Sequence, residues 1–217
     1  SLTERAMAGE NTGEPAFDAL GVVAVESGLT MAMADDVING FALDAADWHP
    51  RTEDDLYRYC FHVAGAVGVM MAVVMGVKPD DRATLNRACD LGMAFQLANI
   101  ARDIEEDDAA GRCYLPDDWM VQLDIAPGEQ MRPHNREKLA LMARWLADEA
   151  GQYEASARVG AARLPFRSRW AVLAAAGIYG DIARKVRAAG GNAWDQRIFT
   201  NKREKLAWVW KAAWTAL

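Results

Sequence analysis

The chain has 217 residues, of which 52% are hydrophobic and 25% are charged. This length and apolar content are enough to bury a hydrophobic core, which excludes an intrinsically disordered polypeptide. The formal net charge of −7 argues against a nucleic-acid partner, because clusters of Lys and Arg are needed to bind phosphate backbones.

The first ten residues and the cysteines indicate a protein of the cytoplasm. Residues 1–10 are polar and carry charges of both signs, which does not fit a signal peptide. Cys60, Cys89 and Cys113 are an odd number at wide spacings, and the sequence has no pair of closely spaced Cys or His residues that could form a zinc site. This pattern predicts reduced thiols and no zinc site.

Apolar residues recur at helical spacing along almost the whole chain, whereas alternating strand patterns are hard to find. The pattern predicts an all-α protein. Pro15 suits the first turn of a helix, and Thr52 with Asp55 and Asn201 with Glu204 have the spacing of a capping box. The expected helices cover about residues 15–27, 29–46, 52–75, 82–106, 135–162 and 168–189, with a last one from 201 onward.

One apolar stretch, residues 59–77, is about as long as a helix that spans a bilayer. It contains His62 and the glycines Gly65, Gly68 and Gly76 within a run of mostly small side chains. We therefore predict a buried helix of a globular protein, in which Gly65 and Gly68 allow close helix packing or leave room for a long ligand.

The helix over residues 82–106 and its end carry a polar stripe. Gln96, Asn99, Asp103 and Asp107 fall within an arc of roughly 80° at about 100° per residue. Carboxylates one turn apart, with an amide one turn before them, can coordinate hard cations such as Mg²⁺ together with substrate phosphates. We expect the four side chains to line one side of a central cavity.

Two arginines lie close to this stripe. Arg102 lies beside it on the helix and Arg112 follows in the next loop, and both offer planar donors suited to diphosphate oxygens. The alternative is that the acidic run 105–108 is only a solvated helix end. That interpretation does not explain two amides that lie deeper in an otherwise apolar helix, so a functional site is favoured.

Residues 90–107 (DLGMAFQLANIARDIEED), followed by 111–116 (GRCYLP), closely resemble the second aspartate-rich motif of squalene and phytoene synthases. The resemblance spans about residues 15–205 and is strongest to the bacterial phytoene synthases. The other matching segments are INGFALD (38–44), YCFHVAGAVGVM (59–70), LPFRSRWA (164–171) and IYGDI (178–182).

The resemblance implies a class I isoprenoid synthase-type helical bundle around a central cavity, with Mg²⁺ or Mn²⁺ as cofactor. It places Tyr59 in the cavity near the reacting carbons, although a tyrosine at this helix position also fits a plain core role. The implied catalytic residues are Tyr59, Asp103 and Asp107, the implied metal ligands Asn99, Asp103 and Asp107, and the implied substrate contacts Gln96, Asn99, Arg102, Arg112 and Tyr179.

Enzymes of this family carry a first aspartate-rich motif on a facing helix. Asp35, Asp36 and Asn39 mimic such a motif, but the resemblance places them where the family has an unrelated helix. We therefore expect residues 1–217 to form a single all-α domain that lacks the amino-terminal helices with the first motif.

The implied reaction joins two geranylgeranyl diphosphates head to head, through a cyclopropyl diphosphate, to give phytoene for carotenoid biosynthesis. Squalene or dehydrosqualene synthesis from farnesyl diphosphate stays open, as does an inactive helical metal-binding fragment. We expect no nicotinamide cofactor, since Gly-x-Gly-x-x-Gly after a strand is lacking. Because the lipids involved are long hydrocarbons, we expect a peripheral enzyme on the inner membrane face. The oligomeric state is left open.

Overall fold

The computed structural model describes residues 1–46 and 48–217. These residues form helices joined by turns and loops, without a strand among them, so the predicted all-α class is confirmed. The elements are α1 (Leu2–Met7), α2 (Pro15–Ser27), α3 (Met31–Ala45), α4 (Glu53–Cys60), η1 (Phe61–Gly65, a π-helical turn), α5 (Ala66–Val74), α6 (Arg82–Ala109), α7 (Asp117–Gln122), η2 (Pro133–Asn135), α8 (Arg136–Ala161), α9 (Phe166–Ala189), η3 (Gly190–Asn192) and α10 (Lys202–Ala216).

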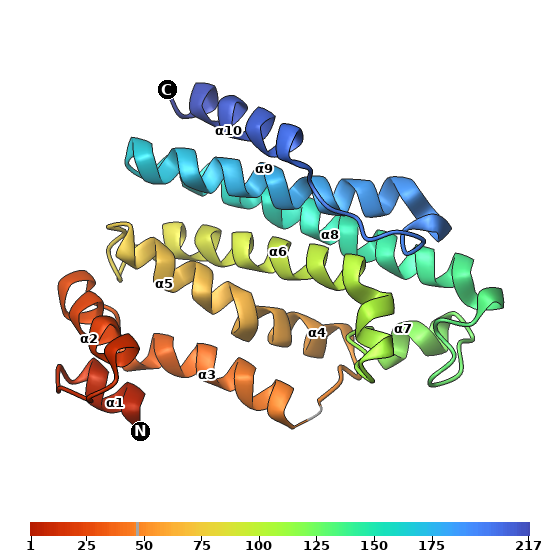
Figure 1. Cartoon of the computed structure of the whole chain (residues 1–217), viewed down its shortest axis with the longest axis horizontal. Helices are drawn as coiled ribbons and strands as arrows, with labels where there is room; N and C mark the ends of the chain where they lie inside the picture. Colours follow the sequence, from red (N-terminus) through yellow and green to blue (C-terminus); the bar gives the residue numbers. More distant parts are fainter. Residues whose placement is uncertain (47) are drawn as a thin grey trace.

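The long helices lie side by side, with α6 at the centre (Figure 1). α8 and α9 pack on one side of α6, and the continuous stretch from α4 through η1 to α5 packs on the other. α3 lies beyond that stretch, and α10 lies outside α9 at the opposite edge of the bundle. α6 is therefore enclosed by other helices on two sides, and the candidate site described below lies along this helix.

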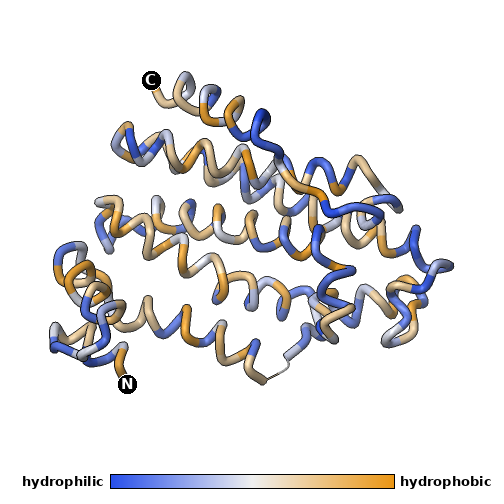
Figure 2. The backbone as a smooth tube through the Cα atoms, viewed as in Figure 1, coloured by the Kyte–Doolittle hydropathy of each residue, from blue (hydrophilic) through white to orange (hydrophobic). Residues whose placement is uncertain are grey.

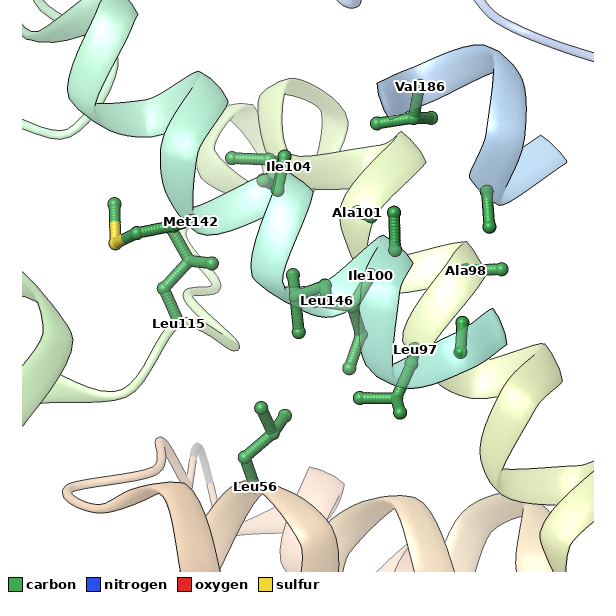
Figure 3. Close-up of a cluster of buried hydrophobic side chains, with 14 of the residues drawn as sticks. Leu56, Leu97, Ala98, Ile100, Ala101, Ile104, Leu115, Met142, Leu146 and Val186 are labelled. Atoms are coloured by element: carbon green, nitrogen blue, oxygen red, sulfur yellow. The ribbon is translucent and has the colours of Figure 1, made fainter. Parts of the chain in front are cut away.

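The hydrophobic core forms around the carboxyl-terminal half of α6 (Figure 3). Leu97, Ile100 and Ile104 point from this helix toward Leu146 on α8 and Leu56 on α4, and all five are at most 5% exposed. Their spacing of three and four residues fixes which side of α6 is buried. The polar stripe is thereby held on a different side of the same helix.

The predicted helix boundaries hold where a capping residue is present. Thr52 with Asp55 and Asn201 with Glu204 both form the expected capping boxes. α9 begins at Phe166, with Pro165 at its N-cap position, so the expected start at residue 168 is wrong by two residues. Proline fixes φ near the helical value and needs no N–H partner there. The short helices α1 and α7 were not predicted, since six residues are too few to show a period.

The glycines at the η1–α5 and α6 contact allow the helix backbones to touch. A Cβ on Gly68 would lie 2.3 Å from the carbonyl oxygen of Ala88, and one on Gly92 would lie 2.1 Å from that of Ala64. A Cβ on Gly65 would lie 2.9 Å from Sγ of Cys89. Close helix packing is therefore one role of Gly68, and because Gly68 also lines the cavity described below, neither of the two predicted alternatives is excluded.

Within the described residues, one helical stretch, Glu53–Val74, passes a test for a membrane-spanning helix by length and composition alone. In its most apolar window, 33% of the residues are buried inside the protein. Cys60 and Val73 are almost fully buried, whereas Val67 and Met71 are about half exposed. One side of this stretch thus packs into the bundle, and the other side lines the cavity described below.

All three cysteines are free, and burial raises the pKa of each thiol. For Cys89 the pKa rises to about 11, through burial first and the nearby Asp90 and Asp36 charges second. We expect alkylation of native Cys89 by iodoacetamide at pH 8 to be at least about a hundredfold slower than in the unfolded chain, because the thiolate is the reactive species. Peptide mass spectrometry with and without denaturant measures both rates, and equal rates would contradict the burial of this thiol.

Candidate active site

An apolar cavity of about 460 Å³ lies between α5, α6, α8 and α9. α6 forms its floor from Thr84 to Asn99, a length of roughly 22 Å at 1.5 Å per residue. Val67 and Met71 of α5 form one wall, and α9 with the end of α8 forms the other. Most of the lining side chains are aliphatic, so the cavity suits a long hydrocarbon chain.

The polar side chains Gln96 and Asn99 lie at one end of this cavity, together with Tyr179. The ring of Tyr179 stacks on Phe95, with the ring centroids 4.1 Å apart. Oδ1 of Asn99 is buried and accepts no hydrogen bond from the described residues. A buried oxygen without a partner costs on the order of 1–3 kcal/mol, so this atom marks a place where a cation or donor would bind favourably.

Asp103 and Asp107 continue the same stripe one and two turns beyond Asn99 and are not among the residues that line the cavity. The expectation that four side chains line it therefore holds for Gln96 and Asn99 only. Both aspartates remain mostly buried, with side chains 18% and 17% exposed. The stripe thus extends from the cavity into a partly buried acidic site at the end of α6.

Arginines neutralise these two carboxylates. Nε of Arg102 donates to Oδ1 of Asp103 at 2.7 Å, and the guanidinium of Arg197 lies 3.2 Å from the same oxygen. Nη2 of Arg112 donates to Oδ1 of Asp107 at 3.4 Å. Planar guanidinium groups bind carboxylates and phosphates with the same geometry, so the same three arginines can also hold diphosphate oxygens.

Burial raises the pKa of the Asp107 carboxyl above its usual value, although the Arg112 guanidinium opposes this shift. Burial thus makes the charged form of Asp107 less favourable than that of a free aspartate, and a bound cation would offset this cost. The described residues contain no group of three or more His, Cys, Asp or Glu side chains that could hold a metal ion by themselves. The oxygens of Asn99, Asp103 and Asp107 fit a hard cation whose remaining ligands come from phosphate.

The structure shows the surroundings of Tyr59, whose expected role near the reacting carbons stays a prediction. This residue is 3% exposed, lies in the core, and is not among the residues that line the cavity. Its ring stacks between Trp48 and Tyr114, and its hydroxyl donates to Oδ1 of Asp44 at 2.9 Å. Burial, aided by Tyr114 and Asp44, raises the pKa of this phenol, so it stays protonated.

Two residues of the site were missed from the sequence. Arg197 lies in a segment without helical periodicity, far from α6 along the chain, so no spacing links it to Asp103. Asp44 accepts hydrogen bonds from Tyr59 and Tyr114, at 2.9 and 3.3 Å. Asp44 is the last residue of the INGFALD segment, and the resemblance of this segment to the family was the one sequence signal that could have indicated Asp44.

A helical bundle whose apolar cavity ends at an amide and carboxylate stripe defines an isoprenoid synthase fold. A ligand-bound crystal structure of a dehydrosqualene synthase has this fold: its TM-score is 0.88, with 27% identity over 99% of this chain and 75% of that one. A squalene synthase from Alicyclobacillus acidocaldarius has a TM-score of 0.80, with 25% identity over 88% of this chain and 72% of that one.

The family model for squalene/phytoene synthase matches residues 2–204, and the chain belongs to this family. It is 48% identical to the 15-cis-phytoene synthase of Pantoea ananas, over 99% of this chain and 69% of that protein. It is 47% identical to the phytoene synthase of Pseudescherichia vulneris, over 98% of this chain and 68% of that protein. The chain thus spans just over two thirds of the length of these relatives.

Proposed function

We propose that the protein is a prenyltransferase of carotenoid biosynthesis, which joins two molecules of geranylgeranyl diphosphate head to head to form phytoene through a cyclopropyl diphosphate. The observation that carries this proposal is the identity of 47–48% to bacterial phytoene synthases over nearly the whole chain. The cavity and the stripe supply the two features that this reaction needs, an apolar container and a diphosphate site.

The cavity length fits the proposed substrate. A twenty-carbon prenyl chain extends about 18 Å, and a fifteen-carbon chain about 13 Å, at the reach per bond of an extended chain. The cavity floor from Thr84 to Asn99 is roughly 22 Å long, so it accommodates the longer chain with its diphosphate end at Asn99. Its aliphatic walls offer water few hydrogen-bond partners, which would help to protect a reactive allylic cation from capture.

In the proposed site, Asn99, Asp103 and Asp107 hold Mg²⁺, or Mn²⁺ in its place. The bound metal would neutralise the diphosphate as it leaves. Arg102 and Arg112 exchange their carboxylate partners for diphosphate oxygens. Both kinds of oxygen accept hydrogen bonds from the planar N–H donors of a guanidinium group. The donors and charges are thereby concentrated at one end of the cavity, where the leaving group carries its negative charge.

The remaining predicted residues have supporting roles in this proposal. Gln96, at the polar end of the cavity, donates to the diphosphate, and Tyr179 closes that end by stacking on Phe95. Tyr59 acts as a positioning residue. Through its bond to Asp44, it joins Tyr114 and orders the loop that carries Arg112.

Arg197 is expected to bind substrate, because it lies 3.2 Å from the carboxylate that holds the metal. Arg197→Gln should raise KM for geranylgeranyl diphosphate about tenfold, with a smaller change in kcat, since a charge-assisted contact to diphosphate is lost. Arg187→Gln is the matched control, because Arg187 is equally exposed and also ion-paired, but to Asp148 on α8. Equal KM values for both variants would remove Arg197 from the site.

A synthase that uses farnesyl diphosphate is the second candidate, favoured by the fold match to a dehydrosqualene synthase. We expect the protein, as its gene encodes it, to convert geranylgeranyl diphosphate at least about tenfold faster than farnesyl diphosphate, given what extra methylenes contribute in an apolar pocket. Extraction and chromatography of the hydrocarbons formed with Mg²⁺ measure both rates. A preference for the shorter substrate would favour squalene or dehydrosqualene synthesis, and no product from either would favour the inactive metal-binding interpretation.

The proposed location is the cytoplasm, at the surface of the inner membrane, where the long hydrocarbon substrate and product partition into lipid. The proposal has the protein bound peripherally: one side of Glu53–Val74 packs in the bundle, and the other lines the cavity. Release from membranes by high salt or carbonate would support it. If only detergent released the protein from membranes, the proposal would be contradicted.

A further inference from the structure

The outer face of α10 is apolar and uncovered. The helix packs on α9 through buried residues such as Ala212 and Ala216. On its opposite face, Leu206, Trp210 and Trp214 follow one another at steps of four and are 61%, 76% and 82% exposed. Figure 2 shows α10 at the edge of the bundle, with a hydrophilic first turn followed by hydrophobic and paler segments. Large apolar side chains gathered in this way mark an interaction site.

The start of α9 extends this face. Phe166 and Trp170 lie there with their rings 6.2 Å apart, and they are 44% and 36% exposed. Nε1 of Trp170 donates to the carbonyl oxygen of Val209 at 2.8 Å, so the start of α9 lies directly beside α10. We call the combined surface, made of Phe166, Trp170, Leu206, Trp210 and Trp214, the tryptophan surface.

Positive charge surrounds the tryptophan surface, although the whole chain has a net charge of −7. Residues 162–170 contain three arginines and no acidic residue. Residues 201–217 contain four Lys or Arg residues and one acidic residue, Glu204, which pairs with Lys185. Tryptophan side chains flanked by cations suit the interface of an anionic bilayer. A second copy of the same positive surface would be repelled.

The tryptophan surface also lies at a defined end of the cavity. Leu164 and Val172, from the α8–α9 turn and the start of α9, line the cavity at the end farthest from Asn99. In Figure 1 this turn and the end of α10 lie together, opposite the end of α6 that carries Asp103. This far end of the cavity, which Thr84 and Arg87 of α6 also line, and the tryptophan surface therefore belong to the same end of the molecule.

We infer that the tryptophan surface docks the protein on an anionic lipid bilayer and holds the end of the cavity near Leu164 and Val172 beside the lipid. The diphosphate site then stays in water at the far end, and a hydrocarbon product leaves toward the membrane. Only this last step rests on the proposed function, because docking itself is measured without substrate.

Flotation with lipid vesicles tests the docking. We expect the protein to bind phosphatidylcholine vesicles that contain phosphatidylglycerol, and to bind pure phosphatidylcholine vesicles less. Trp210→Ala with Trp214→Ala should lower the partition coefficient by at least about tenfold, because two exposed aromatic rings no longer enter the interface. Phe41→Ala is the matched control, since Phe41 on α3 is 71% exposed and lies across the bundle; its binding should not change.

A charge variant gives a second, independent measurement. Arg203→Gln with Lys205→Gln should weaken binding to phosphatidylglycerol vesicles by about tenfold or more and reduce its dependence on salt. The inference is overturned if the tryptophan variant binds like the wild type, or if Phe41→Ala loses as much. It is also overturned if the wild type does not bind vesicles. A dimer in light scattering that the tryptophan variant dissociates would then show that the surface joins two copies of the chain.

The docking and the proposed function fail in distinguishable ways. In detergent micelles that supply dispersed geranylgeranyl diphosphate, the tryptophan variant should form phytoene at the wild-type rate, since its substitutions lie outside the cavity. Vesicle binding without phytoene formation in the wild type would sink the proposed function and leave the docking surface standing.

Discussion

In the protein as its gene encodes it, Asp103→Asn is expected to lower the rate of phytoene formation by about a thousandfold while the protein stays folded. Asp103 lies in the stripe between Arg102 and Arg197, and its carboxylate is one of two charges available to a metal ion there. An amide keeps the shape but loses the charge, so a metal-stabilised leaving group loses on the order of 4 kcal/mol. The measurement is single-turnover formation of phytoene from geranylgeranyl diphosphate with Mg²⁺.

Glu105→Gln is the control for this prediction. This substitution removes the same charge from the same helix, but the side chain of Glu105 is exposed and lies off the stripe. Circular dichroism of both variants checks that α6 remains intact. Phytoene formation by Asp103→Asn within a few-fold of the Glu105→Gln rate would refute a metal-binding role for Asp103.

Gly92→Ala is expected to lower the free energy of unfolding by about 3 kcal/mol. The added Cβ would lie 2.1 Å from the carbonyl oxygen of Ala64 and 2.4 Å from its carbon. Both are backbone atoms, so the contact is relieved only if η1 and α5 move away from α6. Since Gly92 and α5 also line the cavity, the same movement should weaken substrate binding. Urea unfolding followed by circular dichroism measures the stability.

Gly151→Ala provides a control of opposite sign. Gly151 lies inside α8, and a Cβ there meets none of the described atoms within 4 Å. Replacing a glycine inside a helix by alanine should therefore stabilise the protein by about 0.5–1 kcal/mol. If both variants changed stability in the same direction, the close approach at Gly92 would not be the cause.

Much of the fold follows from local patterns in the sequence. The period of apolar residues and the capping boxes at Thr52 and Asn201 located most of the long helices, because these signals act within one or two turns. The start of α9 was misplaced because both Pro165 and Ser168 can stand at the beginning of a helix. Pro165 is the N-cap in the structure, since its ring fixes the backbone and no side-chain cap is needed.

The helical period predicts the part of the candidate site that lies on one helix, whereas Tyr179, which also lines the cavity, was expected only from the family resemblance. Gln96 and Asn99 lie on the cavity because the period of α6 determines their common side. The position of Tyr59 depends on Trp48 and Tyr114, which come from other segments and enclose its ring. Arg197 reaches Asp103 from a loop. Contacts of this kind depend on how distant segments meet, and a single sequence holds no periodic signal for that.

The π-helical turn Phe61–Gly65 changes the phase of the helix in which it lies. A wider turn takes up about one additional residue, which rotates everything after it by about 100° relative to an unbroken α-helix. The half before the turn directs Tyr59 and Cys60 into the core, and the half after it directs Gly68 toward α6 and Met71 toward the cavity. The two halves of this helix thus direct their side chains to different neighbours, which an unbroken α-helix could not do with the same sequence. A deletion inside the turn would bring one half out of register with the helix on which it packs.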